Sequence, residues 1–316
     1  MNNDALSTAV LPDGDLIVGG RFSIAGGVAA SRIARFNPTT QTWSALGTGV
    51  LGDVRALTVL HNGDIVAAGT VSSAGGVLVN RIARFNPTSS TWTSLGSGLN
   101  GTVHALAVLP DGNMIAGGLF SSAGGVEANN IARYDPATNT WSALGSGLGS
   151  TAFALVVLPD GDLVAGGSFI SAGGALANNI ARYNPTTNTW SPLGSGVNSA
   201  IFDMAVLPDG DLVAGGSFQS AGGAQANRIA RYRPATNQWT TLGSGAADIV
   251  NTISVLPDGD IIVGSKWPGT STGYQVAKYQ TATNTWTTLG SGTIGFIGAS
   301  AVLQNGDVIA AGLYLS

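Results

Sequence analysis

The chain has 316 residues, a formal net charge of -4 and a pI near 4.9, and only 9% of its residues are charged. Two lysines and eleven arginines cannot form the basic surface that nucleic acid requires, so we expect no nucleic-acid partner. The absence of cysteine excludes disulfides, thiolate nucleophiles and cysteine-ligated metals. No apolar run approaches the roughly 20 residues that span a bilayer, and the first four residues do not resemble a signal peptide. We therefore expect no membrane insertion.

The chain is an array of one repeated unit. Six of its tryptophans recur with spacings of 49 residues four times and then 47, at Trp43, Trp92, Trp141, Trp190, Trp239 and Trp286. The phrase Leu11-Pro12-Asp13-Gly14-Asp15 keeps the same step and occurs seven times, with its glycine at Gly14, Gly63, Gly112, Gly161, Gly210, Gly259 and Gly306. Repeats of this length indicate a solenoid or a propeller.

Within one unit, four short strands follow one another. Residues 103–109 and 113–118 are apolar runs joined by Asp111-Gly112, which supplies the positive φ values of a tight hairpin turn. A glycine-rich loop follows at 121–129, and then 131–134 and 141–144 form the third and fourth strands. No segment has a sustained helical period. Four antiparallel strands in 49 residues are typical of a propeller blade.

We therefore predict an all-β fold, a single β-propeller domain over residues 1–316. Its expected blades are 5–51, 52–100, 101–149, 150–198, 199–247 and 248–294, followed by a half blade at 295–316. The half blade favours seven blade positions with the last incomplete. The alternatives are six blades with a displaced terminal hairpin, or completion by another chain.

The half blade also suggests a partner. In the seven-position alternative, the run from Val308 to Leu315 would be an apolar sheet edge, and proteins seldom leave such an edge bare. We expect it to pair with its copy in a second chain, which would give a two-fold homodimer. A longer protein whose other residues complete the blade is the alternative.

The glycines and aromatics of the repeat keep fixed phases. Gly117-Gly118 precedes Tyr134 and Trp141, and the same arrangement recurs in most blades, although Ala68-Gly69 and Gly264-Ser265 depart from it. This arrangement resembles the kelch motif, which implies a propeller. The wider phrase resembles repeats of fungal Rax2-type cortical markers and of bacterial surface proteins. Composition also suggests an extracytoplasmic or bacterial-surface origin.

Three repeated columns have structural explanations. The aromatic residues are expected to fill the space between neighbouring blades. An arginine column on the third strand, occupied by Lys278 in blade six, and an aspartate column just after the hairpin turn are expected to form ion pairs between blades. These columns are Arg35, Arg84, Arg133, Arg182, Arg231 and Lys278, and Asp15, Asp64, Asp162, Asp211, Asp260 and Asp307.

Function is expected where the repeat is broken. The second residue of the first strand differs in every unit, being Leu6, Arg55, His104, Phe153, Phe202, Asn251 and Gly298. In a propeller these residues would ring one mouth of the central channel. We predict a ligand site in which Arg55, His104, Asn251 and the neighbouring Asp203 supply polar groups, while Phe153 and Phe202 offer flat apolar faces. The alternative is a variable rim lined by solvent.

The loop of blade six also departs from the repeat. Residues 266–274 replace the usual Ala-Gly-Gly loop and bring in Trp267 and Tyr274, which lie outside the repeated aromatic pattern. These two residues are a candidate partner-binding patch. Filling space beneath the shortened loop is the alternative.

Catalysis finds little support. The copper cofactor of kelch-like galactose oxidases needs a cysteine, the Asp-box of sialidases is absent, and the only histidines, His61 and His104, are expected at opposite ends of a strand. We expect no cofactor and no metal. The predicted function is a non-catalytic binding scaffold that recognises a protein or a glycan. The alternatives are a purely structural array, natural or engineered, and a carboxylate-based hydrolase that uses Asp203.

Overall fold

A computed structural model describes residues 1–246, 248–266, 274–289 and 297–312. Four-stranded antiparallel blades in a propeller arrangement make up the fold, and no helix occurs in these ranges. None of them therefore contains a helix that could cross a membrane. The chain divides into two compact units, Met1–Gly147 and Leu148–Ser316, which we describe separately. The expected single domain stays a prediction.

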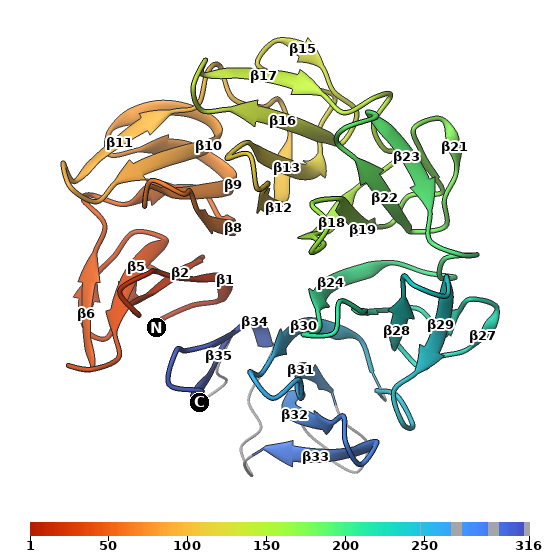
Figure 1. Cartoon of the computed structure of the whole chain (residues 1–316). Coiled ribbons are helices and arrows are strands. Elements are labelled where there is room, and N and C mark those ends of the chain that lie inside the picture. The colour runs from red at the N-terminus through yellow and green to blue at the C-terminus, as the bar shows by residue number, and fades with distance from the viewer. Residues whose placement is uncertain (247, 267–273, 290–296, 313–316) are drawn as a thin grey trace. The chain divides into compact units, whose positions relative to one another are not determined.

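Unit 1 contains three blades whose strands pair in chain order (Figure 1). The first blade is β1(Ala5–Val10), β2(Leu16–Gly20), β5(Ile33–Asn37) and β6(Thr42–Ala45). The second is β8(Val54–Val59), β9(Ile65–Ala74), β10(Val77–Asn86) and β11(Thr91–Ser94), and the third is β12(Thr102–Val108), β13(Met114–Leu119), β16(Ile131–Asp135) and β17(Thr140–Ala143). Shorter strands in the loops and links are β3(Ile24–Ala25), β4(Val28–Ala29), β7(Val50–Leu51), β14(Ser122–Ala123) and β15(Val126–Glu127).

Unit 2 contains three more blades and a two-stranded sheet. The fourth blade is β18(Ala152–Val157), β19(Leu163–Gly167), β22(Ile180–Asn184) and β23(Thr189–Pro192), and the fifth is β24(Ile201–Val206), β25(Leu212–Gly216), β28(Ile229–Arg233) and β29(Gln238–Thr241). The sixth is β30(Val250–Val255), β31(Ile261–Lys266), β32(Tyr274–Gln280) and β33(Thr285–Leu289). The last sheet is β34(Ile297–Val302) with β35(Val308–Gly312), and the loops contain β20(Ser171–Ala172), β21(Ala175–Leu176), β26(Ser220–Ala221) and β27(Ala224–Gln225).

The two-stranded sheet lies beside blade six. Its first strand, β34, packs against β30 as β30 packs against β24. Side chains join the two strands, because the Ser300 hydroxyl lies 2.9 Å from the Thr252 hydroxyl and 2.8 Å from that of Ser254. The predicted fold class is confirmed, with six complete blades and a two-stranded sheet at the next position of unit 2.

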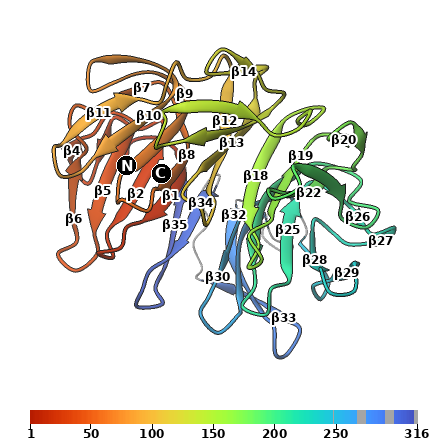
Figure 2. The same ribbon diagram turned by 45° about the horizontal axis from the view of Figure 1, so that its top comes forward.

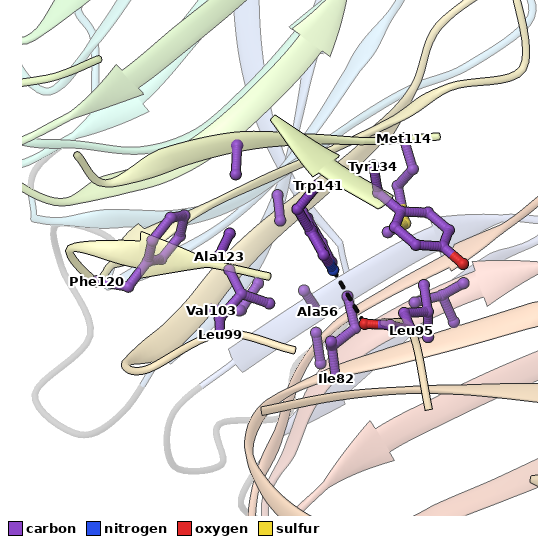
Figure 3. Packing of buried hydrophobic residues seen from close by; sticks show 14 of the residues in the cluster. Ala56, Ile82, Leu95, Leu99, Val103, Met114, Phe120, Ala123, Tyr134 and Trp141 are labelled. Carbon is purple, nitrogen blue, oxygen red and sulfur yellow. Dashed lines mark hydrogen bonds between the residues drawn. The ribbon is translucent and has the colours of Figure 1, made fainter. Parts of the chain in front are cut away.

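Within each unit, an aromatic residue closes the seam between neighbouring complete blades. Trp141 of blade three donates a hydrogen bond from Nε1 to the carbonyl oxygen of Leu95 in blade two, at 2.9 Å (Figure 3). On its own side the indole packs against Gly124, where a Cβ would lie 2.8 Å from the Cβ of Trp141 and where φ is +61°. The same hydrogen bond joins Trp92 to Leu46, Trp239 to Leu193 and Trp286 to Leu242. The prediction that the aromatics fill the space between blades is confirmed.

The two glycines that end the second strand face different neighbours. The first faces the next blade, since a Cβ on Gly166 would lie 2.8 Å from Cγ2 of Ile201. The second, Gly167, lies against the backbone carbonyl of Thr151, where its own blade begins. Blade six keeps the first contact at Gly264, so its departure from the motif does not loosen the packing toward β34.

The ion pairs hold single blades together. In blade four, Arg182 on β22 contacts Asp162 and Asp160 of the preceding hairpin turn, at 2.6 Å each. Equivalent pairs are Arg35 with Asp13 and Asp15, Arg84 with Asp64, Arg133 with Asp111, Arg231 with Asp209 and Asp211, and Lys278 with Asp258 and Asp260. The expectation of pairs between blades was therefore wrong. The third strand lies beside the second, so its arginine reaches the turn across one strand spacing of about 4.8 Å.

A tyrosine and an asparagine add a second link across the seams of the later blades. In blade five the Tyr232 hydroxyl donates to Oδ1 of Asn237 at 2.7 Å, and the same oxygen accepts the backbone N–H of Gly194 in blade four at 3.0 Å. Asn237 has φ +55°, which asparagine tolerates well. Blades three to six all combine Tyr with Asn, whereas blade one has Phe36 with Gln41 and blade two has Phe85 with Ser90.

Installing this link in blade two should stabilise the protein. We expect the double variant F85Y/S90N to raise the free energy of unfolding by about 1 kcal/mol, because it adds one part-buried and one exposed hydrogen bond and places asparagine at φ +53°. Each single variant should gain less than half of that. Chemical denaturation of all four proteins measures the coupling, and strictly additive effects would contradict a shared hydrogen-bond network.

Candidate functional site

The first strand of every blade contains a β-bulge near the blade end where the second strand leads into the loop toward the third. We call this the loop end, and the end with the Asp-Gly turn the turn end. In blade three Val103 pairs with Gly118 and Ala105 with Gly117, so His104 is the extra residue of the bulge. The seven bulge residues are Leu6, Arg55, His104, Phe153, Phe202, Asn251 and Gly298.

These seven are the same residues that the sequence singled out by their variability. A bulge bends its strand and redirects the side chain of the extra residue. It thus explains why this position tolerates a different side chain in every blade. That they form a ligand site stays a prediction.

In unit 1 an ion-pair network surrounds the bulge residue Arg55. Arg21 of blade one contacts Asp4 at 3.2 Å and Asp53 of blade two at 3.0 Å. Arg55 contacts the same Asp53 oxygen through Nη2 at 3.2 Å. Its Nε is buried and has no hydrogen-bond acceptor in the described part of the chain. Arg55 therefore has a buried N–H that a bound oxygen atom could satisfy.

His104 is the neighbouring bulge residue, and it is partly buried. Burial first, and then the charge of Arg55, lower the pKa of its imidazole to about 4, so the ring is neutral near pH 7. The other histidine, His61, is exposed in the hairpin turn that follows β8. The two histidines thus lie at opposite ends of their blades, as their positions in the repeat suggest.

In unit 2 the aromatic bulge residues contact each other. The rings of Phe153 on β18 and Phe202 on β24 have centroids 5.4 Å apart and are tilted by 57°. One blade further on, Nδ2 of Asn251 is buried and has no acceptor among the described residues. The structure brings the two phenylalanines together and leaves Asn251 with a donor that a ligand oxygen could satisfy.

Asp203 links two first strands. Its carboxylate accepts the backbone N–H of Ile253 on β30 at 2.6 Å and that of Met204 at 2.8 Å. Burial raises the pKa of this carboxyl to about 6, although the hydrogen bonds from Ile253, Met204 and the Thr252 side chain act in the opposite direction. These contacts include no second carboxylate. The arrangement fits a structural link better than the carboxylate pair that hydrolysis requires.

The remaining sequence candidates are described only in part. Trp267 lies outside the described residues, and of Tyr274 only the backbone is described, as the first residue of β32. Within the described ranges, no three His, Asp or Glu side chains gather closely enough to hold a metal ion.

A groove of about 440 Å³ lies between blades two and three of unit 1, and the sequence did not predict it. It opens at the loop end and is lined by Ser72, Leu78, Val79, Asn80, Arg81, Ser97, Gly98, Leu99, Asn100, Ser122 and Gly125. Beside it, β9 and β10 are ten residues long each and extend into the loop, where β7 joins them.

At one position of the repeat an asparagine caps the loop between the second and third strands, and blade two lacks this asparagine. In blade three, Oδ1 of Asn100 accepts the backbone N–H groups of Ser121 and Ser122 at 3.0 Å each, and Asn2 and Asn198 cap their loops in the same way. Leu51 takes this position in blade two and Gly149 in blade four. The break at Leu51 was a signal in the sequence that pointed to this loop.

Exposed apolar side chains concentrate at the loop ends of the blades. Of the ten large apolar side chains that are exposed in the described part of the chain, eight lie there, namely Ile24, Leu51, Val77, Leu78, Leu119, Val126, Ile170 and Leu176. Six of them belong to unit 1, and exposed apolar groups that gather at one end of neighbouring blades indicate an interaction surface there. A second groove, of about 420 Å³ at the turn end of unit 2, is lined mainly by the repeated Val-Leu-Pro phrase and so belongs to the framework.

A family model described as the Rax2 C-terminal beta propeller domain matches the chain three times, over residues 9–108, 94–201 and 191–307. The chain belongs to this family. The resemblance to Rax2-type repeats is thus confirmed, whereas the resemblance to kelch repeats stays a prediction. Propellers of the Rax2 and WD40 families are typically non-catalytic, and the fold is commonly a protein-interaction scaffold.

Among solved structures, the crystal structure of the WD40 beta propeller domain of Doa1 is similar to this Rax2-family chain, with a TM-score of 0.69 and 14% sequence identity. The similarity covers 98% of this chain and 90% of that one. At this identity it shows the fold alone. No curated protein matches the chain.

The raised pKa of Asp203 predicts a pH-dependent contribution to stability. A carboxyl with a folded-state pKa near 6, above its ordinary value near 4, stabilises the fold most below pH 4, and this contribution is lost as the pH rises through 6. Between pH 4 and 7, wild type should lose about 2 to 3 kcal/mol of unfolding free energy relative to D203N. Urea denaturation across this range measures the difference. If the unfolding free energies of wild type and D203N changed in parallel with pH, burial would not raise the pKa of Asp203.

Proposed function

We propose that this protein is a non-catalytic recognition scaffold that binds a protein partner through the loop ends of its blades. The observation that carries the proposal is the concentration of exposed large apolar side chains at these ends. Side chains such as Leu78 in blade two and Leu176 in blade four are 85% and 70% exposed, which costs free energy unless a partner covers them.

The bulge residues supply the polar part of the proposed recognition. Arg55 in unit 1 and Asn251 in unit 2 each have a buried N–H for which the described residues offer no acceptor. Buried donors normally find an acceptor, so oxygen atoms of a ligand or of water are expected beside them. The neutral imidazole of His104 adds a hydrogen-bonding group without adding charge. Trp267 and Tyr274 remain proposed members of the partner-binding surface.

A glycan is the second candidate ligand, favoured by the aromatic bulge residues of unit 2. Phe153 and Phe202 contact each other at a tilt of 57°, and aromatic rings beside a hydrogen-bond donor suit the apolar face of a sugar. Asn251 would donate to a sugar hydroxyl. A purely structural array would require neither these donors nor the exposed apolar side chains.

Selection of binding peptides tests the proposed function. A library of random 12-residue peptides displayed on phage should yield sequences that bind the wild-type protein, and a glycan array tests the second candidate in parallel. Among the selected peptides, those that contact the bulge residues should bind R55A or H104A at least tenfold more weakly than wild type. R55A removes a charge-assisted hydrogen bond and H104A removes a neutral one. A library that yields no binder would count against the proposal.

We also propose a two-fold dimer through the edge of β35. In the described part of unit 2, β35 pairs with β34 alone, so the opposite edge of Val308–Gly312 has no strand beside it within that sheet. Pairing with a second copy would satisfy these backbone groups. Light scattering at micromolar concentration should give twice the mass of the chain, which is 31.6 kDa. A monomeric mass that V308P leaves unchanged would exclude edge pairing.

A further inference from the structure

We infer that the groove between blades two and three binds an extended peptide segment that carries one apolar side chain and one carboxylate. This inference rests on the proposed function and deepens it, because it names the class of segment and the blade interface that receives it. The groove, of about 440 Å³, can hold two or three side chains and lies within unit 1.

The charge of the groove selects an acidic ligand. Arg81 is the single charged residue among those that line it, and no aspartate or glutamate belongs to the lining. The Arg81 guanidinium donates to the Thr70 carbonyl oxygen from Nη1 at 3.4 Å, a long hydrogen bond that leaves most of its donor capacity for a ligand. Glu127 lies on the outer strand of the blade-three loop hairpin, exposed and outside the lining. A carboxylate is therefore the complementary group, and an arginine fork can bind it with two hydrogen bonds.

The apolar contact comes from Leu78, which is 85% exposed and also lines the groove. The extended ribbon of blade two contains β10, β9 and β7 in this order (Figure 2). In it both Leu51 on β7 and Leu78 on β10 pair with Ser73 on β9, which lies between them. Residues directly opposite each other on neighbouring strands share one face, so Leu51 and Leu78 flank the serine on the same side. Leu78 belongs to the lining and Leu51 does not, so Leu78 supplies the apolar contact for the bound segment and Leu51 extends the apolar face of the ribbon beyond the groove.

An extended segment fits the walls better than a helix does. One wall is the ribbon of β9 and β10, the other is the loop hairpin of blade three, and the link at 97–100 lies between them. Hydroxyl groups of Ser72, Ser97 and Ser122 line these walls and can bond to a peptide backbone. Such a channel between two ribbons suits the backbone hydrogen bonding and alternating side chains of an extended peptide.

The repeat supplies substitutions that should keep the fold intact. Arg32, Arg81 and Arg228 occupy one position of the repeat with φ of 65° to 68°, and Asn130 and Asn179 occupy it in blades three and four with φ of 64° and 65°. Asparagine therefore already occupies this backbone conformation in two other blades of the protein. Likewise Gln225 stands in blade five where Leu78 stands in blade two. R81N and L78Q remove the proposed contacts, and R228N in blade five is the matched control for the loss of an arginine.

The test is a peptide array read against these three variants. Ten-residue frames of serine and glycine carry one leucine and one glutamate at separations of one to four residues, and each has a twin with glutamine in place of glutamate. We expect wild type to bind at least one Leu/Glu frame about tenfold more tightly than its glutamine twin, by fluorescence anisotropy. R81N should abolish this preference, L78Q should weaken both twins, and R228N should bind as wild type does.

The outcomes separate this inference from the proposed function. If no Leu/Glu frame binds, or if R81N retains the preference for glutamate, the groove does not recognise a carboxylate and the inference is wrong. Phage-selected peptides that still bind, and that respond to R55A rather than to R81N, would then leave the proposed function standing. If R81N and R228N reduced the preference for glutamate equally, that preference would come from arginine charge in general and not from the groove, and the inference would be wrong. Thermal unfolding of each variant confirms that the fold is retained.

Discussion

The seam between neighbouring blades is the constraint on which the rest of the structure depends. A four-stranded blade cannot bury both of its faces alone, so it relies on the next one. In unit 1 the residue that fills the seam between blades two and three is Trp141. Its indole packs against Gly124 of its own blade and donates a hydrogen bond to the carbonyl oxygen of Leu95 in the previous blade. Because Gly124 belongs to the loop between the second and third strands, the same contact that joins two blades also fixes the base of that loop. Packing and loop position are thus specified by one residue column.

With the seams fixed, the parts of the repeat that vary are free to differ in chemistry. The turn ends are uniform, with aspartates held by the arginine or lysine of the third strand in each complete blade. The loop ends carry the bulge residues, the exposed leucines and the groove. This division follows from the fold, since a bulge and a loop tolerate side chains that a paired strand does not. Recognition at the loop ends therefore imposes little cost on the framework.

Much of the fold could be predicted because its signals are local. The Asp-Gly turns, the strand lengths and the tryptophan period lie within one unit, and all led to the observed blades. The ion pairs were assigned to the wrong neighbours because the partner of Arg182 depends on which strand lies beside β22, which spacing alone does not reveal. The bulge residues were found through their variability, although nothing in a sequence announces a bulge at Phe202. The groove could not be predicted because it forms where the extended ribbon of β9 and β10 meets the loop hairpin of blade three, and spacing along the chain does not specify such packing between two blades.

The missing tyrosine hydroxyls of blades one and two have a consequence for motion. The seam between blades two and three combines the Trp141 hydrogen bond with a link from Tyr134 through Asn139 to the backbone N–H of Gly96. Phe85 and Ser90 leave the seam between blades one and two without this link, and the ion pair of Arg21 with Asp53 crosses that seam instead. Dissolved salt weakens an ion pair between partly exposed groups, whereas it has little effect on a hydrogen bond between tyrosine and asparagine. Raised ionic strength would therefore loosen blade two from blade one while the seam beside the groove keeps its links.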